Sequence, residues 1–210
     1  MKQKKIALFG GTFDPIHLAH TKVVQAAIDY LHVDRVVFIP AKRSPLKDAF
    51  PQATDEQRLH MLECAISGNN HFDVSDYELN GPAPSYTLNT IKHFKDILGP
   101  TYSIYWLMGA DAVKDLGEWY GVTELMDLCI PTVMVRPGCP HPDFSPFKVF
   151  LGEERIKKLQ SNLLQTPLID ISSTQVRALL SQDKDARKFL APEVYAYILS
   201  EGMYKTGTNG

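Results

Sequence analysis

Short runs of apolar and β-branched residues recur along the chain, separated by stretches whose apolar positions follow helical spacing. The runs are too short for typical buried helices, so they predict strands. The predicted strands are Lys5–Phe9, Arg35–Pro40, Phe72–Ser75, Ser103–Met108, Pro131–Val135 and Leu168–Ile171. The predicted helices are Ala19–Tyr30, Asp55–Ile66, Leu88–Leu98, Val122–Leu128, Glu153–Leu163, Thr174–Ser181 and Pro192–Ser200.

This alternation predicts an α/β fold, a Rossmann-like doubly wound parallel sheet with a small C-terminal helical region. No repeat, low-complexity tract or flexible linker divides the chain, so we expect a single domain over residues 1–205 and a disordered tail at 206–210. In such a sheet, ligands bind beyond the carboxyl ends of the strands. Function is therefore to be sought in the loops that follow the predicted strands.

Composition narrows the function classes. The chain has 210 residues, of which 44% are hydrophobic and 22% charged, and its formal net charge is -2. A near-neutral charge argues against binding of long nucleic acids but permits small phosphate ligands. No apolar run approaches the roughly 20 residues that span a membrane, and the first residues show no secretory segment. We therefore expect no nucleic-acid partner, no membrane association and a cytoplasmic location.

The cysteines, Cys64, Cys129 and Cys139, are odd in number and widely spaced. They provide neither a disulfide framework nor a Cys-x-x-Cys motif, so reduced thiols are expected. Cys139 and His141 share a proline-rich segment, which favours a surface loop over a metal site. We expect no metal ion held by protein ligands alone.

The segment Gly10–His20, Gly-Gly-Thr-Phe-Asp-Pro-Ile-His-Leu-Ala-His, joins the first predicted strand to the first predicted helix. Unpaired N–H groups and the positive helix end suit a phosphate there, and glycines let the backbone approach it. The segment is neither Gly-x-Gly-x-x-Gly nor a P-loop. His17 and His20 lie on one face of the first turn, where both imidazoles can donate to an anion. The alternative is one surface histidine beside one structural cap.

The segment Ile171–Arg177, Ile-Ser-Ser-Thr-Gln-Val-Arg, follows the last predicted strand and opens a helix. It combines hydroxyls, unpaired main-chain donors and a guanidinium at one location of the size of a phosphate. Taken alone, it could also be a helix N-cap with a solvated arginine.

Together the two segments resemble the signatures of the His-x-Gly-His nucleotidyltransferase superfamily. The Gly-Gly-Thr-Phe-Asp-Pro form is especially similar to the nicotinate-nucleotide adenylyltransferases, and the resemblance runs from about Lys5 to Tyr204. Ala19 departs from the pattern, because it stands where the family usually has glycine.

The resemblance implies an ATP site and a catalytic set. The implied ATP-binding residues are Gly10, Gly11, Thr12, Phe13, Gly109, Asp111, Ser172, Ser173 and Thr174. The implied catalytic residues are His17, His20, Lys47 and Arg177. Asp111 is expected to accept hydrogen bonds from ribose hydroxyls, with a helix cap as its alternative role. Mg²⁺ is expected as a cofactor that arrives bound to ATP.

The resemblance also implies a site for a pyridine mononucleotide, formed by Lys47, Ser85, Tyr86, Thr87, Trp119, Tyr120 and Arg136. An indole face can stack on a cationic pyridinium ring, and N–H groups near Thr87 and Tyr120 could bind its carboxylate. A core role for Trp119 and a surface role for Arg136 are the alternatives.

Lys42, Arg43 and Lys47 lie in the loop after the second predicted strand. The family commonly has Pro-Pro-His-Lys there, and this chain has Ser-Pro-Leu-Lys at 44–47. Lys47 therefore takes the phosphate-binding role by resemblance, whereas an ordinary solvated basic loop is the alternative.

The implied reaction transfers the adenylyl group of ATP to nicotinate mononucleotide, giving deamido-NAD and pyrophosphate in NAD biosynthesis. Another adenylyltransferase of the superfamily, such as pantetheine-phosphate adenylyltransferase, and a non-catalytic nucleotide-binding regulator are the alternatives. The choice between nicotinate and nicotinamide stays open, and a homo-oligomer is compatible with the sequence.

Overall fold

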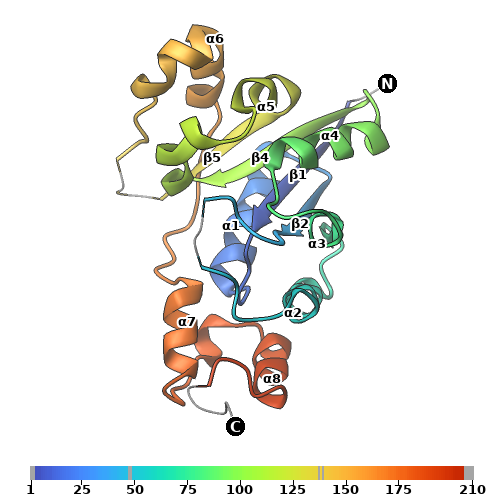
Figure 1. Ribbon diagram of the computed structural model, residues 1–210, viewed down its shortest axis with the longest axis vertical. Helices are drawn as coiled ribbons and strands as arrows, with labels where there is room; N and C mark the ends of the chain where they lie inside the picture. Colours follow the sequence, from blue (N-terminus) through green and yellow to red (C-terminus); the bar gives the residue numbers. More distant parts are fainter. Residues whose placement is uncertain (1–2, 47–48, 137, 139, 206–210) are drawn as a thin grey trace.

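A parallel sheet organises the molecule. The computed structural model describes residues 3–46, 49–136, 138 and 140–205 (Figure 1). Its strands are β1 (Lys4–Gly11), β2 (Arg35–Pro40), β3 (Phe72–Val74), β4 (Tyr102–Gly109), β5 (Ile130–Val135) and β6 (Leu163–Gln165). They pair in parallel in the order β3-β2-β1-β4-β5-β6, which confirms the predicted doubly wound α/β sheet.

Helices cover both faces of this sheet. The α-helices are α1 (Leu18–Leu31), α2 (Asp55–Ile66), α3 (Tyr77–Asn80), α4 (Thr87–Leu98), α5 (Val122–Leu128), α6 (Lys148–Ser161), α7 (Ser173–Leu180) and α8 (Pro192–Ser200). Short 3₁₀ helices are η1 (Ala110–Glu118), η2 (Ser145–Phe147) and η3 (Arg187–Phe189). The sequence predicted most of the α-helices within a residue or two, but it did not predict α3 or any 3₁₀ helix.

Two apolar cores lie on opposite faces of the sheet. Alternate residues of one strand point to opposite sides, so Ala7 and Phe9 pack with α1, α2 and the C-terminal helices, whereas Ile6 and Leu8 pack with α4, α5 and α6. Helices α7 and α8 lie together at one end of the molecule, with α8 against α2 and both far from α5 and α6 (Figure 1). The predicted C-terminal helical region therefore extends the face formed by α1 and α2.

The prediction of the last strand was wrong. Strand β6 is Leu163–Gln165, which pairs with β5, and the predicted strand Leu168–Ile171 is irregular. Pro167 precedes the predicted segment and carries no N–H for a ladder, and Leu168 is 65% exposed. Leu163 continues the apolar spacing of Ile156 and Leu159, so the sequence prediction ended the helix Glu153–Leu163 at this residue and placed Leu164 in no element.

The boundaries of α6 also differ from the prediction. The helix begins at Lys148 rather than Glu153, and it is kinked at Gly152, whose φ of 76° is not helical. It ends at Ser161, with Asn162 as its C-cap. The glycine explains the difference, because the sequence pattern marked only the longer helical piece that follows it.

The described cysteines agree with the prediction of reduced thiols. Cys64 and Cys129 are free, and burial raises the pKa of Cys129 to about 12. Cys139 and the predicted tail at 206–210 lie outside the described residues.

The sheet has a switch point between β1 and β4. The chain continues from β1 to β2 and β3 on one side of this point. It continues from β4 to β5 and β6 on the other side. Ligands bind in doubly wound folds outside the carboxyl ends of the strands at such a point. Gly10 and Gly11 end β1 there, and Gly109 ends the neighbouring β4.

We predict that Gly121→Ala destabilises the fold more than Gly202→Ala. Both glycines have φ near +60°, 61° and 62°, where a Cβ costs about 1–2 kcal/mol. A Cβ at Gly121 would also collide with Cδ2 of Leu88, whereas nothing lies within 4 Å of one at Gly202. Overpacking adds about 1–3 kcal/mol at Gly121. Urea denaturation measures the difference, and equal losses of the free energy of unfolding would contradict this packing.

Candidate active site

The glycine loop that follows β1 is shaped by packing beneath it. A Cβ on Gly10 would lie 2.6 Å from Cη2 of Trp106, and one on Gly11 would lie 2.8 Å from Cζ of Phe13. Phe13 itself is 2% exposed and has φ 50°, so its ring turns into the core. Packing of the fold therefore requires glycine at both positions, whether or not a ligand binds there. Because the ring of Phe13 is buried, only its main chain can contact a ligand.

His17 and His20 form a stacked pair at the start of α1. Their ring centroids are 3.7 Å apart with an interplanar angle of 16°. His17 is the N-cap residue, and its main-chain N–H donates to Nδ1 of His20 at 3.2 Å. Because Nδ1 of His20 accepts this bond, the neutral ring carries its proton on Nε2. Nε2 is then the donor nitrogen of the His20 ring.

Burial keeps His17 neutral. Its residue is 5% exposed, and its Nδ1 is buried with no hydrogen-bond partner within the described part of the chain. Desolvation by burial lowers the pKa of His17 from 6.5 to about 4. The positive helix end disfavours protonation in the same direction. His17 therefore acts as a neutral polar group at neutral pH.

Arg58, on α2, fixes one carbonyl of the glycine loop. Its side chain is fully buried, and Nη1 donates to the Thr12 carbonyl at 2.8 Å. Nη2 pairs with Asp55 at 2.6 Å, which compensates the buried charge. Sequence reasoning missed this residue. Its signal was a charge on the apolar face of a predicted helix, in register with Met61 and Leu62.

Asp14 connects the loop to two distant segments. Its carboxylate is 4% exposed and accepts the N–H groups of Gln52 at 2.8 Å and Ala53 at 3.2 Å. It also accepts the hydroxyl of Tyr204 at 2.7 Å. Sequence reasoning did not assign roles to Asp14 or Tyr204, because their partners are 38 to 190 residues away.

The second predicted motif meets the first at this loop. Ser173 Oγ donates to the Pro15 carbonyl at 2.9 Å, and Arg177 Nη1 donates to the Asp14 carbonyl at 2.6 Å. Arg177 Nη2 lies 3.3 Å from Oγ1 of Thr174, which is exposed. The start of α7 thus adjoins the loop that carries the histidines. The two predicted motifs form one site.

Ser172 has the structural role that was its alternative. It is the N-cap of α7, and its Oγ accepts the N–H of Gln175 at 3.2 Å. In return, Oε1 of Gln175 accepts the N–H of Ser172 at 2.7 Å. The capping box fixes the first turn of α7, from which Ser173 and Thr174 project.

At the end of β4, Gly109 and Asp111 form a close pair. A Cβ on Gly109 would collide with Oδ1 of Asp111. Asp111 lies in the first turn of η1, whose N-cap is Gly109, so Asp111 is not the cap residue. Its side chain is exposed, at the switch-point edge of the sheet. This placement suits a carboxylate that receives hydroxyl donors.

The predicted aromatic pieces also come together. Tyr86, the N-cap of α4, has its ring centroid 4.8 Å from that of Tyr120, which is 59% exposed. Trp119 is partly buried against the core, and its Nε1 is buried with no partner among the described residues. Thr87 is the first residue of α4. Trp119 therefore packs partly in the core, which was the alternative to a ring-binding role. Beside it, Tyr86 and Tyr120 form an aromatic pair.

The basic loop is tied to this aromatic segment. The N–H of Lys42 donates to Oγ of Ser85 at 3.0 Å, and its Nζ donates to the Gly81 carbonyl at 3.1 Å. The guanidinium of Arg43 lies 4.6 Å from the ring centre of Phe50.

Lys47 and Arg136 are the other predicted substrate-side cations. Lys47 lies outside the described residues. Arg136 follows β5 and is exposed, and the structure brings it into no hydrogen bond or ion pair with another described residue.

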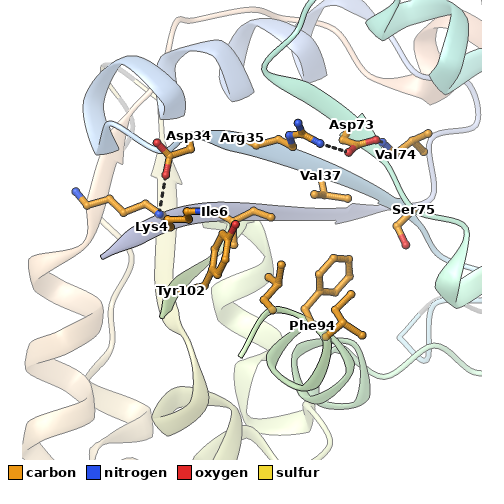
Figure 2. A pocket seen from close by; sticks show the side chains of 13 residues that line it. Lys4, Ile6, Asp34, Arg35, Val37, Asp73, Val74, Ser75, Phe94 and Tyr102 are labelled. Carbon is orange, nitrogen blue, oxygen red and sulfur yellow. Dashed lines mark hydrogen bonds and ion pairs between the residues drawn. The ribbon is translucent and has the colours of Figure 1, made fainter. Parts of the chain in front are cut away.

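A second groove lies away from the glycine loop and from α7, and it contains none of the predicted site residues. Figure 2 shows it, lined among others by Lys4, Asp34, Arg35 and Tyr102 near the amino ends of β1, β2 and β4, by Phe94 of α4, and by Ser75 after β3. Arg35 pairs with Asp73 at 2.7 Å in this groove, and Asp34 accepts the main-chain N–H of Lys5 at 2.9 Å (Figure 2). The candidate site therefore remains at the carboxyl edge.

Comparison with known proteins identifies the class. Residues 8–179 match the cytidylyltransferase-like family, so the match spans both the glycine loop and most of α7. The chain is thus a nucleotidyltransferase of this family. Enzymes of the family generally use a divalent metal ion together with ATP.

Curated relatives identify the branch. A protein of Clostridium tetani named "Probable nicotinate-nucleotide adenylyltransferase" is 34% identical over 202 residues, covering 96% of this chain and 100% of the relative. A protein of the same name from Rhodopirellula baltica is 32% identical over 200 residues, covering 95% of this chain and 93% of the relative. The chain belongs to the nicotinate-nucleotide adenylyltransferase family.

A solved structure agrees in fold. Plasmodium falciparum nicotinic acid mononucleotide adenylyltransferase complexed with NaAD matches with a TM-score of 0.72 at 21% identity, covering 96% of this chain and 97% of that chain. In the part of this chain that the structure describes, no helix has the length and apolar character to cross a membrane. The same part contains no group of three His, Cys, Asp or Glu side chains suited to a metal ion.

We predict that His17 makes the fold less stable in acid. Its pKa is about 4 in the folded protein and 6.5 ordinarily, so the unfolded chain binds more protons between these values. The stability is present above pH 6.5 and is lost as the pH falls toward 4. The expected loss from pH 7 to pH 5 is about 2 kcal/mol.

Urea denaturation of the wild type and of His17→Asn at both pH values measures this loss. Asparagine is a good N-cap residue and does not titrate, so the variant should lose less stability in acid. An equal loss in both proteins would contradict the neutral, buried state of His17.

Proposed function

We propose that this protein transfers the adenylyl group of ATP to nicotinate mononucleotide, forming deamido-NAD and pyrophosphate in NAD biosynthesis. The observation that carries the proposal is the contact of the two motifs, since Arg177 reaches the Asp14 carbonyl at 2.6 Å. One phosphate chain can then meet α1, α7 and the histidine pair together. The names of the relatives and of the structural neighbour support the same substrates.

The reaction needs placement more than it needs a base. A phosphate monoester has its second pKa near ~6, so the attacking oxygen of nicotinate mononucleotide is already ionised at neutral pH. It forms a bond to the α-phosphorus of ATP while the bond to the bridging oxygen breaks, and pyrophosphate leaves. No proton is abstracted and no covalent enzyme intermediate is required. The protein must align two anions and stabilise the developing charge.

We assign that charge stabilisation to the catalytic set. His20 offers Nε2–H, and Arg177 keeps further N–H groups beside its bond to Asp14. His17 contributes as a neutral dipole because of its lowered pKa. Lys47 adds charge from the basic loop. Ser173 and Thr174 line the first turn of α7, where unpaired N–H groups favour phosphate oxygens.

The remaining predicted residues complete the two binding sites. For ATP, these are Gly10, Gly11, Thr12, the main chain of Phe13, Gly109, Asp111 and Ser172. For the pyridine mononucleotide, these are Lys47, Ser85, Tyr86, Thr87, Trp119, Tyr120 and Arg136. The pairing of Tyr86 with Tyr120 supports a single ring-binding surface.

We propose Mg²⁺ as the divalent ion. Mg²⁺ prefers water and substrate phosphate oxygens to an all-protein cage, which fits a site where Asp111 is exposed and the Asp14 carboxylate is already occupied by N–H and hydroxyl donors. When bound to ATP, the ion neutralises phosphate charge. We further propose that residues 1–205 act as one nucleotidyltransferase domain in the cytoplasm.

Pyrophosphate release tests the function. ATP is incubated with nicotinate mononucleotide, nicotinamide mononucleotide or phosphopantetheine in turn, and both products are quantified. The proposal requires turnover with the nicotinate substrate to exceed turnover with the others. Preference for phosphopantetheine, or no pyrophosphate with any acceptor, would refute it.

In the same assay, we predict that His20→Ala lowers kcat by about 10²- to 10³-fold, because it removes one preorganised donor. Its thermal denaturation should stay cooperative, which separates loss of chemistry from loss of fold. Full turnover in a folded His20→Ala protein would show that His20 has no catalytic role.

We predict that Ala19→Gly lowers stability without improving ATP binding. Ala19 is 9% exposed and belongs to the core on the α1 face, so its methyl group is accommodated by packing. Glycine in a helix costs about 1 kcal/mol relative to alanine. The melting temperature should fall while KM for ATP stays within about twofold. A tenfold fall in KM would show instead that the methyl group obstructs ATP.

A further inference from the structure

A buried carboxylate lies beneath the segment assigned to the pyridine ring. Glu78, in α3, is 7% exposed. Its Oε1 accepts the hydroxyl of Thr90 at 2.5 Å, and Thr90 is 1% exposed on α4. Among the described residues, no cation forms an ion pair with Glu78. A buried charge of this kind is costly unless hydroxyls or N–H groups compensate it.

The second compensating group is the hydroxyl of Ser85. Burial raises the pKa of Glu78, and hydrogen bonds from Thr90 and Ser85 oppose that rise. Oγ of Ser85 already accepts the N–H of Lys42 at 3.0 Å. A serine hydroxyl has one proton to donate, and with the N–H of Lys42 on the acceptor side, that proton is available to Glu78.

Ser85 also contacts the basic loop. The N–H of Ser85 donates to the Arg43 carbonyl at 2.9 Å, so Ser85 and residues 42–43 exchange two hydrogen bonds. Lys42 Nζ also donates to the carbonyl of Gly81, the C-cap of α3. The loop that leads to Lys47 is thus attached to the helix that carries Glu78.

Thr90 connects Glu78 to the aromatic segment at Tyr86. Thr90 lies in the first turns of α4, which begins at Thr87 directly after Tyr86. Its N–H donates to the Tyr86 carbonyl at 3.3 Å. Tyr86 contacts Tyr120. Helix α3, which carries Glu78, is thus linked to both flanks of the proposed mononucleotide site, to α4 through Thr90 and to the basic loop through Gly81.

We propose that Glu78 is a positioning residue for the pyridine mononucleotide, which holds Ser85 and Thr90 so that the ring-binding segment and the basic loop keep their relative placement. This inference rests on the proposed function and deepens it. Glu78 touches no substrate, and its effect is on binding of one substrate only. ATP meets the glycine loop and α7, which Glu78 does not contact.

The test compares Glu78→Gln, Thr90→Val and the control Glu154→Gln in steady-state kinetics. Gln keeps the volume, but it replaces one acceptor oxygen by an NH₂ group, which cannot accept a hydroxyl proton. We expect Glu78→Gln to raise KM for nicotinate mononucleotide about 10-fold, the effect of one lost hydrogen bond to a charged group. KM for ATP and kcat should stay within about twofold. Glu154 is an exposed carboxylate on α6, so Glu154→Gln should change none of these values.

Thr90→Val removes the other hydroxyl with little change in shape, and it should raise the same KM even if Glu78→Gln folds poorly. A double-mutant cycle of Glu78→Gln with Ser85→Ala should be non-additive, because both changes break one contact. Equal rises in both KM values, a fall in kcat alone, additive effects, or no change in folded variants would overturn the inference.

Calorimetric titration with nicotinate mononucleotide separates this inference from the proposed function. A wild type that neither binds this nucleotide nor turns it over refutes the function. An active wild type whose Glu78→Gln and Thr90→Val variants bind equally well refutes only the positioning role.

Discussion

Side-chain donors hold the carbonyl groups of the loop between β1 and α1, and the rest of the site depends on this constraint. Arg58, Ser173 and Arg177 donate to the carbonyls of Thr12, Pro15 and Asp14, respectively. A main chain whose carbonyls are bonded on one side can present its N–H groups to the other. These donors come from α2 and α7, so the loop takes its shape only when both flanking regions are folded.

The electrostatics of the site follow from the same packing. His17 is buried by the loop and stays neutral, while His20 stacks on it and has its tautomer set by a main-chain N–H. Within the two motifs, positive charge therefore comes from Arg177, which donates to the Asp14 carbonyl. Such an arrangement leaves the centre polar and moderately charged, which suits a reaction in which two anions must approach each other.

The sequence predicted what local rules determine. Helix α2 begins at Asp55 because Thr54 and Gln57 form a capping box, and α8 begins at Pro192, where proline suits a first helical turn. The two motifs, Gly10–His20 and Ile171–Arg177, were recognised because each is contiguous. Strand β6 was misplaced because Leu163 continues a helical pattern and only pairing with β5 selects the strand. Arg58, Asp14, Tyr204 and Glu78 act through partners distant in sequence or through burial, which periodicity does not encode.

The link between Ser85 and the basic loop uses main-chain atoms of residues 42 and 43. Side chains in this loop can therefore change during evolution while its anchorage persists. Ser44 and Leu46, which stand where the family commonly has proline and histidine, are two such changes. The link to Ser85 thus does not depend on the side chains of residues 42 and 43, so the chemistry that this loop displays can drift while that link is kept.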